Sequence, residues 1–140
     1  MTSNYYIEYL LQSETSFLGC FHINNLPPCP KTLPASLIIY RDKHWTSLKI
    51  VDNELCLYFD SFGERVHDIK LINYLSSTYQ YIIYNSVQIQ HDLSDKCGLF
   101  CVLFIRLVTS LSRFKDFVQL FDKYNLYYND HILANGIKFT

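Results

Sequence analysis

The sequence predicts an α+β domain in which a mixed, mainly antiparallel sheet is flanked by helices and a cysteine opens a central helix. Short runs rich in β-branched and aromatic residues, bounded by turn residues, indicate strands over residues 37–40, 44–51, 54–60 and 81–89. Apolar residues that recur every three or four positions indicate helices elsewhere. The chain has 140 residues, 49% of them hydrophobic, so we expect a single domain spanning residues 1–140 with one buried core.

The N-terminal half is predicted to contain a helix, a loop and a hairpin. Residues 5–12 have the spacing of a short amphipathic helix. Residues 17–28 contain glycine and proline and are expected to form an irregular loop with apolar anchors. Because Asp and Asn at residues 52–53 favour a tight turn, the strands 44–51 and 54–60 are expected to pair as a hairpin.

The C-terminal half is predicted to place one strand between helices. Apolar residues at helical spacing across residues 66–75 indicate a surface helix, and the run that starts at Tyr81 indicates a buried strand. Residues 97–108 are apolar on almost every side, which is typical of a helix at the centre of a domain. Residues 114–121 indicate a final amphipathic helix.

Charge and cysteine content argue against several classes of protein. With 12 Lys and Arg against 13 Asp and Glu, the net charge is -1, so no basic surface for nucleic acid or anionic lipid is expected. Five cysteines without paired spacing indicate a reducing compartment and no metal site; the one alternative is an irregular group of Cys20, Cys29, Cys56 and a histidine. The longest apolar run ends at Arg106, far short of the roughly 20 residues of a membrane span, so we expect a soluble protein.

Cys97 is the strongest candidate for a nucleophile. It opens the sequence Cys-Gly-Leu-Phe-Cys (residues 97–101) at a predicted helix start, where backbone N–H groups and the helix dipole stabilise a thiolate. A cysteine nucleophile also needs a base, a group that orients the base and donors for the oxyanion. His44 at the start of one strand, Asp60 at the end of the next and Gln90 before the cysteine are the candidates.

Each of these residues also has an ordinary explanation. A buried free cysteine usually behaves as a small hydrophobic residue, and Cys101, one helical turn after Cys97, is expected to lie in the core. Asp60 fits a turn before glycine, and Gln90 fits an exposed strand end. The catalytic interpretation therefore depends on all four residues occurring together.

The hairpin register decides whether His44 and Asp60 can meet. A two-residue turn at residues 52–53 sets His44 opposite Ser61 and directs Asp60 to the other face of the sheet. A three-residue turn over residues 51–53 sets His44 directly opposite Asp60, and a bulge near the strand end has the same effect. The sequence leaves these alternatives open.

In its motifs the chain resembles the adenain family, the cysteine proteases of adenoviruses and of related Maverick/Polinton elements and adintovirus-like viruses. The motifs follow one another in the family's order: His44-Trp45, Phe-Asp-Ser-Phe-Gly (residues 59–63), Gln90 and Cys-Gly-Leu-Phe-Cys (residues 97–101). The resemblance runs from about Phe17 to Ile105, and its most specific part is the Cys-Gly-Leu-Phe-Cys sequence.

The resemblance implies a fold shared with SUMO-protease-like cysteine peptidases. It also implies a viral cysteine endopeptidase that cleaves capsid and core precursor proteins during virion maturation. In this scheme Cys97 is the nucleophile, His44 is the base and Asp60 orients the base. The Gln90 amide and the Cys97 backbone N–H would form the oxyanion hole.

The same resemblance bears on substrate contacts, cofactors and location. Trp45 and Gly98 are expected to contact the substrate, and the chemistry requires no cofactor. In the adenoviral enzymes an activating capsid peptide is disulfide-linked to a cysteine between the carboxylate and the glutamine, but this chain has none between Cys56 and Cys97. Activation by a peptide or by DNA stays an open alternative. The missing cysteine argues against a disulfide-linked peptide, and the balanced charge argues against DNA. We expect the protein to be a monomer. We expect it in the virion and inside the host cell, where the nucleus is the expected compartment.

Two other functions stay open from the sequence. The order of His-Trp, Asp, Gln and Cys-Gly is also similar to that of proteases acting on ubiquitin-like conjugates, so a deubiquitinase-like or deSUMOylase-like isopeptidase is one alternative. The other is a virion interaction module that has the same fold and no activity. All four catalytic positions are filled, which favours an enzyme.

Overall fold

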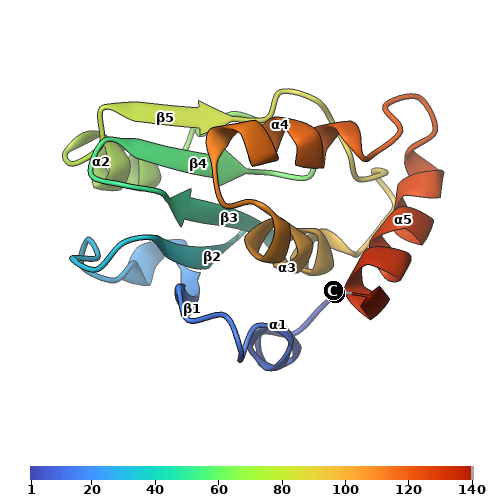
Figure 1. Cartoon of the computed structure of the whole chain (residues 1–140), viewed down its shortest axis with the longest axis horizontal. Helices are drawn as coiled ribbons and strands as arrows, with labels where there is room; N and C mark the ends of the chain where they lie inside the picture. Colours follow the sequence, from blue (N-terminus) through green and yellow to red (C-terminus); the bar gives the residue numbers. More distant parts are fainter. Residues whose placement is uncertain (140) are drawn as a thin grey trace.

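The computed structural model of the protein describes residues 1–139, which form a five-stranded sheet with helices packed on both faces (Figure 1). In chain order the elements are α1 (Asn4–Leu10), β1 (Phe17–His22), the 3-10 helix η1 (Ile23–Asn25), β2 (Ala35–Arg41), β3 (His44–Ile50), β4 (Leu55–Phe59), α2 (Ile69–Ser76), β5 (Tyr81–Tyr84), α3 (Cys97–Leu107), α4 (Leu111–Gln119) and α5 (Leu126–Phe139). The predicted α+β class with a mixed sheet and flanking helices is confirmed.

The strands lie in the sheet in the same order as in the chain, β1-β2-β3-β4-β5. β2, β3 and β4 are antiparallel, whereas β1 is parallel to β2 and β5 is parallel to β4. Half of the pairings are thus parallel, and the prediction of a mainly antiparallel sheet was too strong. The reason is that both outer strands are joined to their neighbours by crossover connections, which contain η1 on one side and α2 on the other.

The sheet separates two apolar layers. On one face, Phe59 of β4 stacks on Phe104 of α3 with ring centroids 5.1 Å apart, and α3 is buried from Phe100 to Ile105. On the other face, Leu48 of β3 packs with Leu71 of α2. α3 is therefore the central helix that its composition predicts, and its first residue is Cys97.

Three elements differ from the sequence predictions. The expected loop at residues 17–28 begins with β1, because Phe17 and the residues after it pair with β2 across an irregularity at Gly19. The strand at Tyr81–Tyr84 is shorter than predicted and partly exposed, since β4 is its single neighbour in the described sheet. The helix predicted at 114–121 is not the last one: α5 follows it, and its interspersed polar residues obscure an apolar pattern.

Candidate active site

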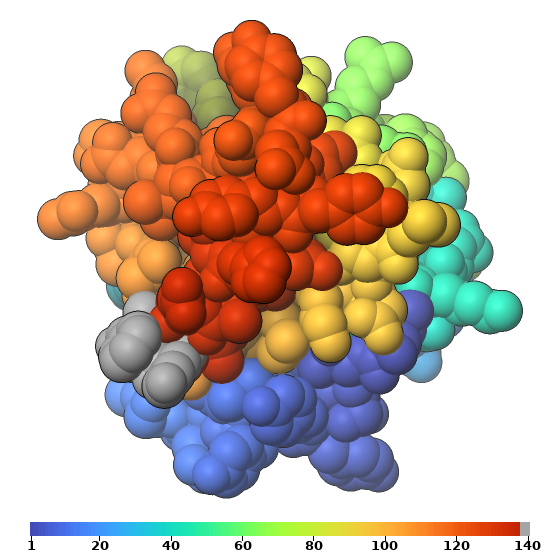
Figure 2. Space-filling view, turned by 90° about the vertical axis from the view of Figure 1, so that its right-hand side faces the viewer, coloured from blue at the N-terminus to red at the C-terminus, as the bar shows by residue number. Residues whose placement is uncertain are grey.

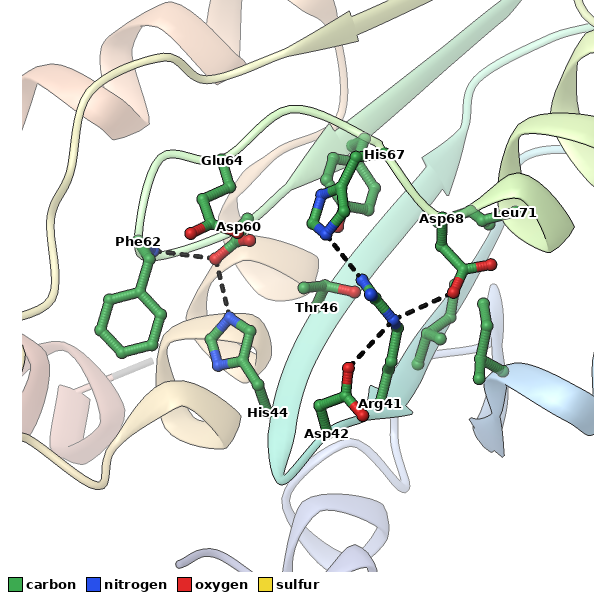
Figure 3. Close-up of a pocket in the computed structure, with 13 residues that line it drawn as sticks. Arg41, Asp42, His44, Thr46, Asp60, Phe62, Glu64, His67, Asp68 and Leu71 are labelled. Carbon is green, nitrogen blue, oxygen red and sulfur yellow. Dashed lines mark hydrogen bonds and ion pairs between the residues drawn. The ribbon is translucent and has the colours of Figure 1, made fainter.

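His44 and Asp60 come together at the end of the β3–β4 hairpin. His44 is the first residue of β3, Asp60 directly follows β4, and His44 Nε2 lies 2.7 Å from Asp60 Oδ1 (Figure 3). Ser47 pairs with Phe59, so the register continued by one residue sets Thr46 opposite Asp60. Both registers considered from the sequence were therefore wrong. The two side chains meet as diagonal neighbours on one face of the hairpin.

The turn of the hairpin explains this register. Asp52 Oδ1 accepts hydrogen bonds from the backbone N–H groups of Glu54, at 2.8 Å, and Leu55, at 2.9 Å, while Val51 N–H donates to the Leu55 carbonyl. Glu54 is thereby held in the turn and does not begin the strand. Thr46, and not His44, lies opposite Asp60, which is a shift of two residues from the register that would pair His44 with Asp60 directly. Because side chains alternate between the two faces with a period of two, His44 and Asp60 still lie on the same face.

Hydrogen bonds to its side chain and to its backbone hold Asp60 in place. Its Oδ1 atom also accepts a hydrogen bond from the Phe62 backbone N–H at 2.8 Å, and its side chain is almost fully buried. Its own backbone N–H donates to Asn85 Oδ1, and Asn85 Nδ2 donates back to the Asp60 carbonyl at 2.6 Å. The Phe62 ring stacks on His44 with centroids 4.7 Å apart. The carboxylate and the imidazole are thus both held in place before any ligand binds.

Cys97 completes this arrangement from the start of α3. Burial alone lowers the pKa of His44, but hydrogen bonds and charge interactions with Asp60 and Cys97 outweigh it and raise that pKa from 6.5 to about 9. Because Nε2 is bonded to Asp60, Nδ1 is the nitrogen that remains for the thiol. Among the described residues, no side chain caps the N-terminus of α3. The backbone N–H groups of its first turn are therefore available to hydrogen-bond another acceptor.

Gln90 lies in the segment between β5 and α3 and is 1% exposed. Its Oε1 atom accepts a 2.5 Å hydrogen bond from Ser61 Oγ, and its Nε2 donates to the Ser94 carbonyl at 2.7 Å. The amide is therefore buried and oriented, not exposed at a strand end. Nε2 carries two hydrogens, so one is left for a substrate oxygen. The structure joins Gln90 to the loop before Cys97 and gives no direct Gln90–Cys97 bond among the described residues.

Trp45 and Gly98 lie against each other beside this site. A Cβ atom added to Gly98 would be 3.2 Å from Trp45 Cδ1 and 3.0 Å from both Ile7 Cδ1 and Thr2 Cβ. Gly98 is consequently buried against the N-terminal residues of the chain. Cys101 is fully buried and donates to the Trp45 carbonyl, as expected of a core residue.

A cavity of about 230 Å³ opens on the other side of His44. Phe62 and Glu64 form its wall near Asp60, and Figure 3 shows Arg41 pointing into its opposite end. Arg41 bonds to His67 at 2.9 Å and to Asp68 at 3.0 Å. The cavity thus lies directly beside the imidazole.

Sequence reasoning missed two residues that connect the site. Ser61 bonds to Gln90, and Asn85 bonds to Asp60. Neighbouring residues in an extended chain face opposite sides, so a carboxylate directed at His44 implies that Ser61 points toward α3. That alternation was the available signal for Ser61, whereas the role of Asn85 depends on the pairing of β5 with β4.

The structure and two comparisons bear on the remaining expectations. Among residues 1–139, no group of three or more His, Cys, Asp or Glu side chains is placed to hold a metal ion, so the alternative with Cys20, Cys29 and Cys56 has no site there. In the same part of the chain, no helix combines the length and apolar character needed to cross a bilayer. Comparison with protein-family models and with curated protein sequences gives no match.

Proposed function

We propose that this protein is a cysteine endopeptidase of the adenain-like kind. The observation that carries the proposal is the His44 imidazole, which is bonded at 2.7 Å to the buried Asp60 carboxylate and interacts with Cys97 at the first position of α3. A thiol, a base and a group that orients the base are the parts that covalent acyl transfer requires.

The mechanism begins with a proton transfer. His44 takes the proton of Cys97, and the imidazolium is stabilised by Asp60, which favours a thiolate–imidazolium pair. The thiolate sulfur attacks the carbonyl carbon of the scissile bond, and the C–N bond breaks as His44 returns the proton to the leaving amine. Water, activated by His44, then attacks the thioester and releases the acid and the free thiol.

The oxyanion of the tetrahedral intermediate needs preorganised donors. The Cys97 backbone N–H at the start of α3 and the second Nε2 hydrogen of Gln90 are suited to this role. Ser61 supports the arrangement because its hydroxyl fixes the Gln90 oxygen, which directs the amide nitrogen away from Ser61. The Asp60–Ser61 dipeptide thus orients the base with one residue and the oxyanion donor with the next.

We propose viral capsid and core precursor proteins as substrates, cleaved during virion maturation inside the virion and the host cell. The sequence resemblance supports this class of substrate. The cavity beside His44 supports recognition of a peptide side chain next to the scissile bond. The proposed reaction uses the thiol, the imidazole and water, and needs no cofactor.

Coexpression with viral capsid and core precursor proteins tests the proposal. The wild-type protein and Cys29→Ser, a change at a thiol near Thr78 and away from the site, should give processed precursors. Cys97→Ser and His44→Ala should give none, as seen by mass spectrometry of the products. Unchanged processing with Cys97→Ser would remove Cys97 from the mechanism.

Propargyl-ended ubiquitin and SUMO probes separate an endopeptidase from an isopeptidase. Such a probe forms a covalent bond with the active thiol when the enzyme recognises the ubiquitin fold. We expect no labelling of Cys97, and labelling that Cys97→Ser abolishes would assign the protein to ubiquitin-like conjugates instead.

A further inference from the structure

The first three residues of the chain, here called the N-terminal strap (residues 1–3), separate two cavities. One cavity has a volume of about 470 Å³, and its lining includes Tyr40 and Trp45. The other has a volume of about 340 Å³, and its lining includes Lys96 and Leu99. The strap lines both cavities. Figure 2 shows the indigo atoms of the chain start lying against the gold atoms of the segment that enters α3. The strap is therefore a wall that the two cavities share.

The strap makes two contacts of a kind that a bound peptide can also make. Trp45 Nε1 donates a 3.0 Å hydrogen bond to the Thr2 carbonyl, and Thr2 Cβ occupies space next to Gly98 that a side chain there would fill. A fixed donor that captures a backbone carbonyl and a glycine that allows close approach are common in peptide recognition. Trp45 directly follows His44 in the chain, and Gly98 directly follows Cys97, so both anchors adjoin the reacting groups.

The strap can leave without unfolding the helix behind it. Ser3 is extended, with φ -77° and ψ 154°, and its hydroxyl accepts the Tyr6 backbone N–H at the start of α1. Ile7 and Leu11 anchor α1 in the core with 0% and 1% exposure. The chain can therefore pivot at Ser3 while α1 stays in place.

We propose that the N-terminal strap occupies one arm of the substrate groove and must be displaced by an extended substrate peptide. The inference rests on the proposed protease function. The incoming peptide presents a backbone carbonyl to Trp45 Nε1 and a small side chain to Gly98, as Thr2 does now. Thr2 Cβ already lies 3.0 Å from the place a Cβ atom on Gly98 would take, and Ile7 and Trp45 border the same space, so we expect a small side chain to fit there better than a large one.

Trp45 is the single tryptophan of the chain, so one indole N–H resonance reports on the strap. A chain made from a cleavable fusion so that it begins at Ser3 keeps the cap of α1 and lacks Met1 and Thr2. We expect its indole resonance to move and its Cys97 to react with iodoacetamide at least about fivefold faster, because a self-occupied site reduces the competent population. Tyr5→Ala in the full chain, a change at a side chain 78% exposed, is the control and should behave as wild type.

Two peptides and one further variant sharpen the test. The peptide acetyl-Met-Thr-Ser-Asn-amide should restore the indole resonance of the shortened chain and protect Cys97, whereas acetyl-Met-Phe-Ser-Asn-amide should do neither. Thr2→Phe in the full chain should reproduce the faster labelling without any truncation.

The outcomes distinguish this inference from the proposed function. An unchanged indole resonance and unchanged labelling in the shortened chain would overturn the strap, even if the full-length protein cleaves precursors. An indole resonance that responds to truncation and is restored by the first peptide would support the groove, even if Cys97 proves no more reactive than Cys101 and the protease function fails.

Discussion

At the scale of single residues, His44 is the group whose properties depend most on the fold. Its hydrogen bonds to Asp60 and its interaction with Cys97 offset the burial that would otherwise favour the neutral ring. The same interactions stabilise the folded chain in a pH-dependent way.

The free energy of unfolding should fall as the pH rises from 6.5 to about 9, the ordinary and the raised pKa of His44. The folded state binds the proton more tightly, so this stabilisation is complete below the unfolded pKa and is lost as the pH rises through the folded one. Urea denaturation at several pH values should show the slope for the wild type and for His131→Ala, a change at an exposed residue of α5. The slope should flatten in His44→Ala, and an equal slope there would contradict the assignment.

Iodoacetamide should label Cys97 at least about tenfold faster than Cys101 near neutral pH. Burial raises the pKa of Cys101 well above 9.0, whereas Cys97 has an imidazole partner at a helix N-terminus. Mass spectrometry of tryptic peptides measures both rates in one sample. His44→Ala should slow the labelling of Cys97 and leave Cys101 unchanged; slow, equal labelling of the two thiols in the wild type would count against the pair.

At the scale of elements, the segment that follows β4 positions the site. Asp60 and Ser61 leave the strand toward His44 and Gln90, and the Gly63 N–H donates to the Asp60 carbonyl at 2.8 Å. Ser61 also accepts backbone hydrogen bonds from Ile89 and Gln90, so the segment before α3 is tied to the end of β4. The imidazole of His44 and the amide of Gln90 are therefore both bonded to one short piece of backbone.

Gly63→Ala should destabilise the protein by about 2 kcal/mol or more and reduce cleavage activity. Gly63 has φ +75°, and a Cβ atom there would lie 2.7 Å from the backbone of Val87 and Gln88. Gly136→Ala is the control, because the nearest atoms to its added methyl belong to the Leu103 side chain, at 3.0 Å and 3.1 Å, and not to the backbone. Urea denaturation measures the stability and peptide cleavage measures the activity. Equal effects of the two substitutions would show that the backbone around Gly63 is not constrained.

At the scale of the whole molecule, α5 closes the site from outside. Asn129 is fully buried and donates to the Ile89 carbonyl at 2.8 Å, next to Gln90. His91 stacks on Tyr127 with centroids 3.7 Å apart, and Ser94 Oγ donates to Asp130 Oδ1. The last helix of the chain thus contacts the Gln90 loop at three points, far from it in sequence.

Asn129→Ala should lower the free energy of unfolding by about 2–3 kcal/mol, because buried backbone groups lose their partners. The Asn129 amide also donates to the Asp122 carbonyl and accepts the Asp122 N–H, so the loop before α5 should loosen as well. Gln119→Ala removes an exposed amide from α4 and should change stability by less than about 0.5 kcal/mol. A comparable loss in both variants, measured by urea denaturation, would refute the role of Asn129.

Local patterns account for what could be predicted. The apolar run after Cys97 favours a central helix, and short apolar and aromatic runs bounded by turn residues favour β3 and β4. β1 could not be predicted, because its stability comes from pairing with β2 across a connection containing prolines. α5 could not be predicted either, since buried Asn129 reads as a polar interruption until its partners are known.

The sequence alone was enough to predict the cysteine at a helix start, the order of His44, Asp60, Gln90 and Cys97, and the hairpin that carries the first two. Those features depend on residue type and on neighbours a few positions away. Only the tertiary structure decided the register, the bond from Ser61 to Gln90 and the cover over Gly98, because each depends on atoms brought together by the turn, the sheet and the packing of distant segments.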